Sequence, residues 1–280
     1  MLKSYFFIPA DKEKFIGKMD SIKADEFVFD FEDALAENLY EQALDNVKKA
    51  ANFTTHFVRP KLFDNSDNLS LGVFEDLLNI GFRKFVLPKV SSTINLKKIE
   101  NKLESIGFKN SDIQVILLIE DPHGLIYAKE LLENSGLQVI GIGLGSHDYS
   151  RQIGMTHTLE NLGYARAHVL NIAKAFRIEA IDIASMNVSN EQEFDTEIKT
   201  GFELGYDSKF IIHPFQLNLL KQYLYYSKEV VDEANEVYSE IEKFEKEDFS
   251  VIKVNGKIFE KPHIDRIKKI IKWAESNGSQ

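Results

Sequence analysis

Two acidic residues close two long apolar runs in the middle of the chain. The run Ile113–Ile119 is followed directly by Glu120, and the run Leu137–Leu144 is followed closely by Asp148. Aliphatic runs of this length are typical of strands buried on both faces of a parallel sheet. Helix-forming residues at about 122–134 supply a crossover, and a right-handed crossover places both strand ends on one side of the sheet. We therefore expect the two carboxylates to converge as oxygen ligands for a cation such as Mg²⁺.

A second interpretation of Glu120 and Asp148 stays open at this point. Both could be solvated loop carboxylates, or acids placed at helix N-termini, where the helix dipole favours negative charge. Spacing alone does not separate metal binding from these alternatives.

The composition excludes several classes of function. The chain has 280 residues, a net charge of -10 and no cysteine. The charge argues against nucleic acid or an anionic membrane as the main partner, although a bound cation and one arginine would admit a small anionic substrate. Without cysteine there are no disulfides, thiolate metal sites or thiol nucleophiles. With no run of about 18 apolar residues and no signal-peptide pattern, we expect no membrane span and a cytoplasmic protein.

One unit recurs along the chain: a short apolar run, a polar stop and an amphipathic helical stretch. The predicted strands lie near 4–9, 26–32, 55–60, 84–90, 113–120, 137–145, 178–184 and 208–214, and the predicted helices near 12–19, 37–50, 68–79, 94–106, 122–134, 160–176 and 191–204. About eight βα units in roughly 225 residues predict an α/β protein with a (β/α)₈ TIM barrel. A doubly wound sheet is the competitor, but no glycine-rich turn follows the first run.

The chain beyond the barrel has a different pattern. We assign residues 1–225 to a catalytic barrel domain and residues 226–280 to a C-terminal extension of helix, β-hairpin and helix. The hairpin is predicted from two alternating runs joined by Asn255-Gly256. An isolated hairpin is only marginally stable in water, so we expect this one to pack on its own barrel or on a neighbouring subunit.

Ionisable residues gather at the predicted C-terminal ends of the strands, where active sites of such barrels lie. Counting along the runs gives Asp30, Glu32, Asp33, Arg59, Lys89, Glu120, Asp148 and His213. Asp30 and Glu32 share one strand face, whereas Asp33 is expected to open the next helix. This set contains the residue types needed for metal-assisted chemistry on an acid.

The cationic residues of this set have alternative roles. Arg59 could hold a substrate carboxylate with its bidentate fork, or form a structural ion pair with Asp30 and Glu32. Lys89 could bind substrate or be a solvated lysine. His213 could contact a ligand or be a hydrogen-bonded structural histidine. Of the other histidines, His147 is of interest because it adjoins Asp148.

Taken together, the motifs resemble those of the HpcH/HpaI aldolase and citrate lyase β-subunit family. The segments that carry the resemblance are FFIPADKEKFIGKM at 6–19, FVFDFEDAL at 27–35, FVRPK at 57–61, FVLPKV at 85–90, LLIEDPHGL at 117–125, GLGSHDYSRQIG at 143–154, GYDSKFIIHPFQL at 205–217 and GKIFEKPHIDRIKKII at 256–271. The resemblance covers essentially the whole chain, in order.

This resemblance implies a homotrimer or hexamer in which Mg²⁺, with Mn²⁺ as an alternative, is held by Glu120 and Asp148. It implies that Arg59 holds the carboxylate of a 2-oxo acid and that Glu260 reaches a neighbouring active site. The implied reaction is carbon–carbon cleavage or condensation between that acid and an acyl-CoA, an acyl-carrier thioester or an aldehyde. Candidate catalytic residues are then Arg59, Glu260, Asp30 and Glu32, and candidate substrate-binding residues are Arg59, Lys89 and His213.

The chain departs from the family pattern around the substrate. Pro60-Lys61 follows Arg59 in place of Val-Asn, Ala10 replaces a glycine, and Asp121-Pro122 replaces a threonine after Glu120. Glu260 is longer than the expected aspartate. Two alternatives to a lyase therefore stay open, a malyl-CoA-type thioesterase and a barrel that has lost catalysis and serves as a binding or scaffold subunit.

Overall fold

The computed structural model describes residues 1–32, 35–64, 66, 68–243, 251–254 and 256–277. Asp33 and Asn255, for which the sequence suggested a helix start and a hairpin turn, lie outside the described residues. The chain divides into two compact units, one of Leu2–Tyr223 and one of Leu224–Gln280 together with Met1.

The first unit is a closed barrel of eight parallel strands in sequential order, which confirms the predicted TIM barrel. The strands are β1 (Lys3–Pro9), β2 (Glu26–Asp30), β3 (Phe57–Arg59), β4 (Lys84–Leu87), β5 (Gln114–Ile119), β6 (Gln138–Leu144), β7 (Glu179–Asp182) and β8 (Ser208–Ile211). Several strands end before the polar residues that closed the predicted runs. The C-terminal ends of all eight strands therefore lie on one face, with the polar stops in the loops that follow.

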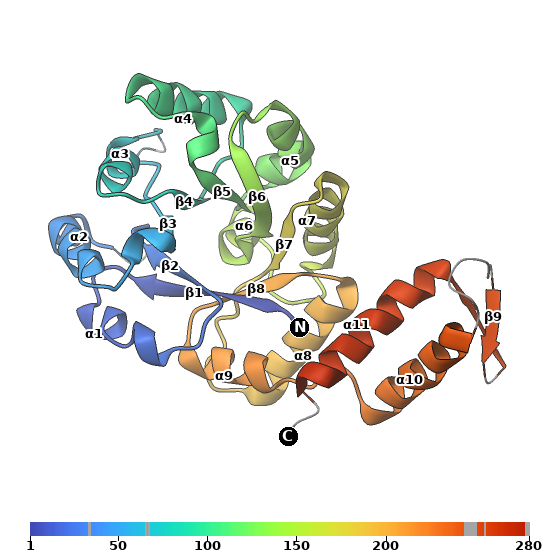
Figure 1. The fold of residues 1–280 in the computed structure, drawn as a ribbon. Coiled ribbons are helices and arrows are strands. Elements are labelled where there is room, and N and C mark those ends of the chain that lie inside the picture. Colours follow the sequence, from blue (N-terminus) through green and yellow to red (C-terminus); the bar gives the residue numbers. More distant parts are fainter. Residues whose placement is uncertain (33–34, 65, 67, 244–250, 255, 278–280) are drawn as a thin grey trace. The chain divides into compact units, whose positions relative to one another are not determined.

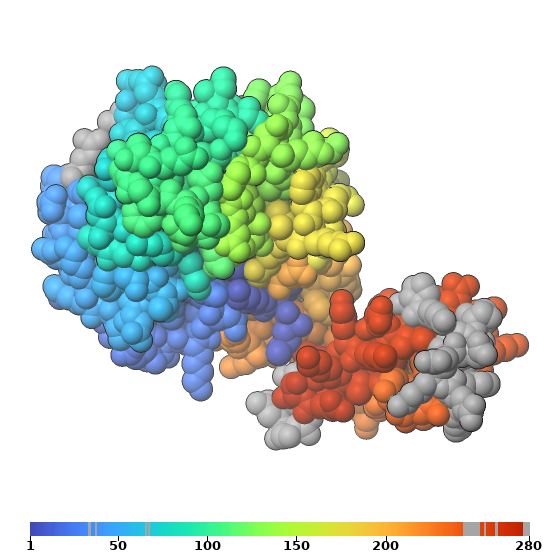
Figure 2. Space-filling view, turned by 45° about the horizontal axis from the view of Figure 1, so that its top comes forward, coloured from blue at the N-terminus to red at the C-terminus, as the bar shows by residue number. Residues whose placement is uncertain are grey.

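Helices surround the strands on the outside of the barrel (Figure 1). They are α1 (Glu13–Ile16), α2 (Tyr40–Lys48), α3 (Gly72–Asn79), α4 (Thr93–Ser105), α5 (Pro122–Asn134), α6 (Ser146–Ile153), α7 (Gly163–Phe176), α8 (Glu191–Leu204) and α9 (Pro214–Gln222), with short 3₁₀ turns η1 (Met19–Ser21), η2 (Glu37–Leu39), η3 (Phe53–Thr55) and η4 (Asn110–Asp112). On the face seen in the space-filling view, segments from much of the first unit, coloured by residue number, pack into a continuous surface (Figure 2).

Helix α6 corrects the sequence analysis, which predicted no helix between residues 134 and 160. The helix begins at Ser146, so Asp148 lies in its first turn, and it ends at Ile153, followed by the C-cap Gly154 with a φ of 76°. Its sequence SHDYSRQI spans only eight residues and is mostly polar, with Tyr149 and Ile153 as its two large apolar residues, so it gives a weak helical signal.

Side chains from the strands fill the barrel interior. The core contains Tyr5, Val28, Phe57, Val86, Ile116, Leu118, Ile181 and Phe210, all buried. Strand β6 contributes Ile140, which packs partly buried against this cluster, and Gly143, where the Phe210 ring occupies the space that a side chain would take. A Cβ at Gly143 would lie 2.5 Å from Phe210 Cε2. The barrel is therefore a packed core, and a ligand must bind at its rim.

The second unit has its own core. It consists of α10 (Lys228–Lys243), the antiparallel strands β9 (Val251–Val254) and β10 (Lys257–Glu260), and α11 (Lys261–Asn277). Val254 packs in a cluster with Ala234 and Val237 of α10 and with Ile267 and Ile270 of α11. The hairpin is thus supported by helices of its own extension, a possibility that the sequence analysis did not consider. Among the described residues, no helix is both long and apolar enough to cross a membrane.

Candidate metal and carboxylate site

Glu120 is a buried carboxylate at the end of β5. It follows Ile119 directly and is 3% exposed. Its Oε2 accepts a hydrogen bond of 2.9 Å from the backbone N–H of Lys89. Its side chain lies against Gly145, where a Cβ would stand 2.5 Å from Glu120 Cγ and 2.6 Å from Oε1. Because Gly145 has no side chain, the Glu120 side chain can occupy the space beside it.

Asp148 follows the next strand, β6, and lies in the first turn of α6. The strand before it is anchored to β5, because the Gly145 N–H donates to the Ile119 carbonyl at 2.7 Å. Asp148 Oδ1 accepts from Arg151 NH2 at 2.6 Å. Glu120 and Asp148 line the same cavity, so the structure brings together the two predicted ligand residues.

Arg59 ends β3 and is held by Asp30, the last residue of β2, and by Glu32, which follows that strand. Its Nε and NH2 donate to Asp30 Oδ1 and Oδ2 at 2.8 and 2.7 Å, and its NH1 lies 3.0 Å from Glu32 Oε2. All three side chains are nearly buried, and the Arg59 guanidinium also lies over the Phe7 ring at 5.1 Å. The ion pair that the sequence left open is therefore present, and it fixes the plane of an arginine that lines the cavity.

Lys89 connects the group formed by Arg59, Asp30 and Glu32 to Glu120. Its Nζ lies 2.6 Å from Glu32 Oε1, while its backbone N–H holds Glu120. Lys89 adopts a left-handed conformation with φ of 56°, which is uncommon outside glycine, asparagine and aspartate. Sequence reasoning considered the ammonium group but not this backbone amide, because no residue pattern predicted the unusual conformation.

These residues surround a cavity of about 360 Å³ at the C-terminal rim of the barrel. Its polar lining consists of Asp30, Arg59, Glu120, Ser146, His147 and Asp148. Glu32 and Lys89 contact lining residues, because Glu32 pairs with Arg59 and the Lys89 N–H donates to Glu120. The cavity has the size and mixed polarity of a small-molecule site.

The electrostatics of the cavity suit a hard divalent cation. Burial raises the pKa of Glu120 well above its ordinary value, and nearby Glu32 and Asp148 raise it further against the lowering effects of Arg59 and Lys89. Three lining carboxylates face one guanidinium, and a divalent cation would offset that excess of negative charge. No three described His, Asp or Glu side chains form a ligand cluster. Two carboxylates are nevertheless enough for Mg²⁺, which usually keeps several waters or substrate oxygens.

His147 lines the cavity beside Asp148 and is held by a second histidine. Its ring stacks on His157 with the centroids 3.9 Å apart and the planes 7° from parallel, and His157 Nε2 lies 2.9 Å from Ser146 Oγ. Burial lowers the pKa of both histidines, and for His147 the neighbouring His157 lowers it further. This stack could not be foreseen, because His157 lies beyond the helix that the sequence analysis missed.

Two predicted site residues are not among the described residues that line this cavity. His213 is the N-cap of α9, where its Nδ1 accepts from the Phe215 N–H at 3.1 Å, and it is not among the described residues that line the cavity. Glu260 ends β10 in the second unit, is exposed, and donates its backbone N–H to His263. Their predicted roles in binding and catalysis stay predictions.

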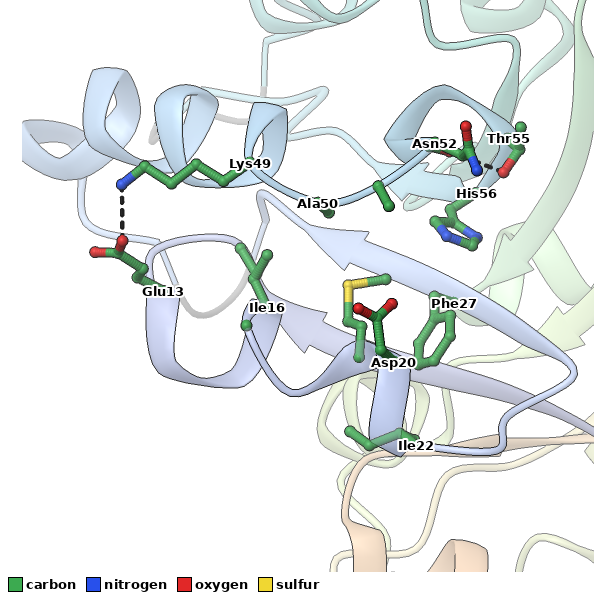
Figure 3. Close-up of a pocket in the computed structure, with 13 residues that line it drawn as sticks. Glu13, Ile16, Asp20, Ile22, Phe27, Lys49, Ala50, Asn52, Thr55 and His56 are labelled. Carbon is green, nitrogen blue, oxygen red and sulfur yellow. Dashed lines mark hydrogen bonds and ion pairs between the residues drawn. The ribbon is translucent and has the colours of Figure 1, made fainter.

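A second and larger cavity, of about 550 Å³, lies between α1 and η1 on one side and the end of α2 and η3 on the other (Figure 3). Ile16 and Phe27 contribute apolar surface, and Glu13 and Lys49 form an exposed ion pair of 2.8 Å at its edge. Asp20 and His56 come from opposite sides of it. Its described lining lacks a buried acid like Glu120, so we assign the chemistry to the smaller cavity.

Comparison with known proteins agrees with this architecture. The citrate lyase subunit beta of Haemophilus influenzae is 25% identical over 290 residues, with 98% of this chain and 97% of that protein covered. A (3S)-malyl-CoA thioesterase of Cereibacter sphaeroides is 24% identical over 279 residues, covering 98% of this chain and 95% of that protein. In fold, the chain is similar to the protein CitE from Mycobacterium tuberculosis, solved with magnesium, acetoacetate and coenzyme A, with a TM-score of 0.80, 19% identity and 98% of both chains covered.

The model of one family matches residues 3–214, which include all eight strands of the barrel. The chain therefore belongs to the HpcH/HpaI aldolase/citrate lyase family.

Proposed function

We propose that the protein is a Mg²⁺-dependent carbon–carbon lyase or aldolase, similar to the citrate lyase β subunit. It would cleave or form a bond between a 2-oxo acid and an acyl-CoA, an acyl-carrier thioester or an aldehyde. The observation that supports this proposal most directly is that Glu120, Asp148 and Arg59 line a single cavity at the rim of the barrel.

The substrate acid would bind between the metal-ligand pair and Arg59. Arg59 would hold its carboxylate by charge and by N–H donors, while Asp30 and Glu32 keep the guanidinium plane fixed. When bound at Glu120 and Asp148, Mg²⁺ supplies Lewis-acid polarisation of the keto oxygen. A fixed arginine needs no reorganisation on binding, which is how a preorganised site lowers a barrier.

Condensation also needs a base to remove a proton from the carbon next to the thioester carbonyl or from the methyl carbon of pyruvate. The electron pair of that C–H bond then forms the new C–C bond to the carbonyl carbon of the keto acid or aldehyde, and the oxygen of that carbonyl takes up a proton. Asp30 is engaged by two N–H groups of Arg59, which favours a positioning role. Glu260 from a neighbouring subunit is the other candidate base, as the family resemblance implies, in a homotrimer or hexamer.

Hydrolysis of a malyl-type thioester is the second candidate. It is favoured by the malyl-CoA thioesterase relative, whose identity of 24% is close to the 25% of the citrate lyase subunit. Incubation with malyl-, citramalyl- and citryl-CoA separates the two activities. A lyase releases acetyl-CoA and a 2-oxo acid, whereas a thioesterase releases free CoA and the intact hydroxy acid.

Calorimetric titration with Mg²⁺, alone and with pyruvate, tests the site itself. We expect Glu120→Ala and Asp148→Ala to abolish measurable binding of Mg²⁺, and Arg59→Ala to weaken binding of pyruvate in Mg²⁺-containing buffer. Glu104→Ala, an exposed acid on α4, is the matched control and should bind like the wild type. Unchanged Mg²⁺ affinity in both site variants would show that the metal assignment is wrong.

A further inference from the structure

The lining of the rim cavity is divided into a charged part and a hydrocarbon part. The charged groups come from the ends of β2, β3 and β5 and from α6. The hydrocarbon groups come largely from β1, β6, β8 and the segment after β7, and they include Phe7, Leu144, Ala184, Phe210 and Ile212. Met186, in the segment after β7, belongs to the same part of the lining. Because β6, β7, β8 and β1 follow one another in the closed barrel, these side chains line one arc of the rim, here called the hydrocarbon wall.

Positive charge is scarce in this cavity. Arg59 is the one lysine or arginine among the described residues that line it. The nearby cations Lys89 and Arg151 already contact acids, at 2.6 Å from Glu32 and 2.6 Å from Asp148. A second substrate carboxylate placed against the hydrocarbon wall would lose water and gain no partner, which is costly.

The hydrocarbon wall is held in place by a buried polar network. Lys209 Nζ donates to the Ile183 carbonyl at 2.8 Å, and Gln216 Nε2 donates to the carbonyls of Ser185 and Asn187 at 2.7 and 2.8 Å. These bonds fix the segment that carries Ala184 and Met186 into the cavity lining. Met186 is 65% exposed although it is apolar, so an apolar group of a ligand would gain by covering it.

We infer that the 2-oxo acid recognised by this site is a monocarboxylate with a hydrocarbon substituent, of the pyruvate type, and not a dicarboxylate. The inference rests on the proposed function and narrows its substrate class. The single carboxylate lies at Arg59, and the alkyl group of the acid faces the wall formed by Phe7, Phe210 and Met186.

Two stable acids of equal carbon number test the inference by calorimetry in Mg²⁺ buffer. 2-Oxopentanoate and 2-oxoglutarate differ by a terminal methyl group in one and a carboxylate in the other, and pyruvate serves as the smallest member of the class. We expect 2-oxopentanoate to bind about tenfold or more tightly than 2-oxoglutarate, because the second carboxylate is left unpaired. Equal or tighter binding of 2-oxoglutarate would overturn the inference.

A substitution on the wall tests the same point independently. Met186→Arg places a cation at an exposed lining position and should narrow the preference for 2-oxopentanoate by about tenfold, because the second carboxylate gains a charged partner. Met186→Leu is the matched control and should keep the wild-type ratio. An unchanged ratio in Met186→Arg would show that the tail of the acid does not face this wall.

The outcomes separate the inference from the proposed function. If 2-oxo acids bind with Mg²⁺ but the dicarboxylate is preferred, the lyase proposal stands and only the monocarboxylate inference fails. If neither pyruvate nor either five-carbon acid binds in the presence of Mg²⁺, the proposed function fails and the inference falls with it.

Discussion

Glu120 and Gly145 are in such close contact that no other residue fits at the glycine without a shift. A Cβ on residue 145 would lie 2.5 Å from Glu120 Cγ and 2.6 Å from its Oε1. The glycine is tied to the strand that carries the acid, because its N–H donates to the Ile119 carbonyl. The position of Glu120, the proposed metal ligand, therefore depends on residue 145, just after the adjacent strand β6, being a glycine.

Gly145→Ala is expected to displace the Glu120 carboxylate. The added methyl group must move either the acid or the backbone, and overpacking of this kind costs about 1–3 kcal/mol. We predict that the affinity for Mg²⁺ falls by about tenfold or more, since ligand geometry is demanding for this ion. Calorimetric titration with Mg²⁺ measures the affinity, and urea denaturation measures the free energy of unfolding.

Gly163→Ala is the matched control for that variant. Gly163 opens α7, and nothing lies within 4 Å of the position its Cβ would take. Because alanine favours helix and restricts the unfolded chain, this variant should be as stable as the wild type or slightly more so. Wild-type Mg²⁺ affinity in Gly145→Ala would mean that Glu120 does not depend on this space.

The roles of Asp30 can be separated by Asp30→Asn. The amide keeps the shape of the side chain but loses the bidentate carboxylate that holds Arg59. If Asp30 positions Arg59, we expect KM for the 2-oxo acid to rise about tenfold with a smaller change in kcat. If Asp30 is instead the base, kcat falls by about a hundredfold or more with KM little changed. Steady-state kinetics of the cleavage reaction distinguishes these results.

Much of the fold and site was predictable because βα alternation fixes where strands end. Each apolar run stops at a polar residue, and parallel connection places these stops on one face, so Asp30, Arg59 and Glu120 could be grouped from the sequence. The closed barrel follows from the same repetition. Grouping Asp30, Arg59 and Glu120 at one face of the barrel required no knowledge of side-chain packing.

The features that the sequence analysis did not predict depend largely on contacts between distant segments of the chain. The left-handed conformation of Lys89, which directs its amide to Glu120, is set by tertiary context and has no local signal in a lysine. The choice between ion pair and substrate anchor for Arg59 could not be made, because its geometry against Asp30 and Glu32 depends on the register of β2 and β3. Helix α6 was missed because it is only eight residues long and mostly polar, with two large apolar residues, Tyr149 and Ile153.

Gly201→Ala should destabilise the barrel and not the metal site directly. The Cβ would collide with Asp182, a fully buried acid that Arg166 holds through two N–H donors at 3.0 and 2.8 Å. We predict a loss of about 1–3 kcal/mol in the free energy of unfolding, because the buried pair cannot relax into solvent. Urea denaturation measures it. Gly72→Ala, with open space around its Cβ, is the control, and equal stability of the two variants would contradict the prediction.

The Asp25 carboxylate should make stability fall at acid pH. Burial pushes its pKa upward, but hydrogen bonds from Lys221 and from the hydroxyl and N–H of Ser4 outweigh this, so the pKa lies below its ordinary value of 3.8. A carboxylate whose pKa is lower in the folded than in the unfolded protein stabilises the fold at every pH above its unfolded-state pKa. This contribution is lost as the pH falls through its folded-state pKa.

Asp25→Asn tests this linkage by urea denaturation between pH 7 and pH 3. The variant should be less stable than wild type at pH 7, and the difference should shrink as the pH falls below the ordinary value of 3.8. Asp45→Asn, at an exposed ion pair with Lys48, should change stability by less than about 1 kcal/mol. A difference between wild type and Asp25→Asn that is the same at all pH values would contradict the linkage.

The proposed role of Glu260 in a neighbouring subunit predicts complementation between two inactive variants. Glu120→Ala would remove a proposed metal ligand from its own cavity, and Glu260→Gln would remove a base that serves another chain. If the base is supplied by a neighbour, a mixed oligomer contains some cavities that have both an intact Glu120 and an intact Glu260. Co-expression of the two variants should therefore restore part of the wild-type activity, whereas mixing Glu120→Ala with Asp148→Ala should restore none, because both changes lie in the same cavity. Activity in Glu260→Gln alone, or no recovery in oligomers shown by mass spectrometry to contain both variants, would remove Glu260 from the site.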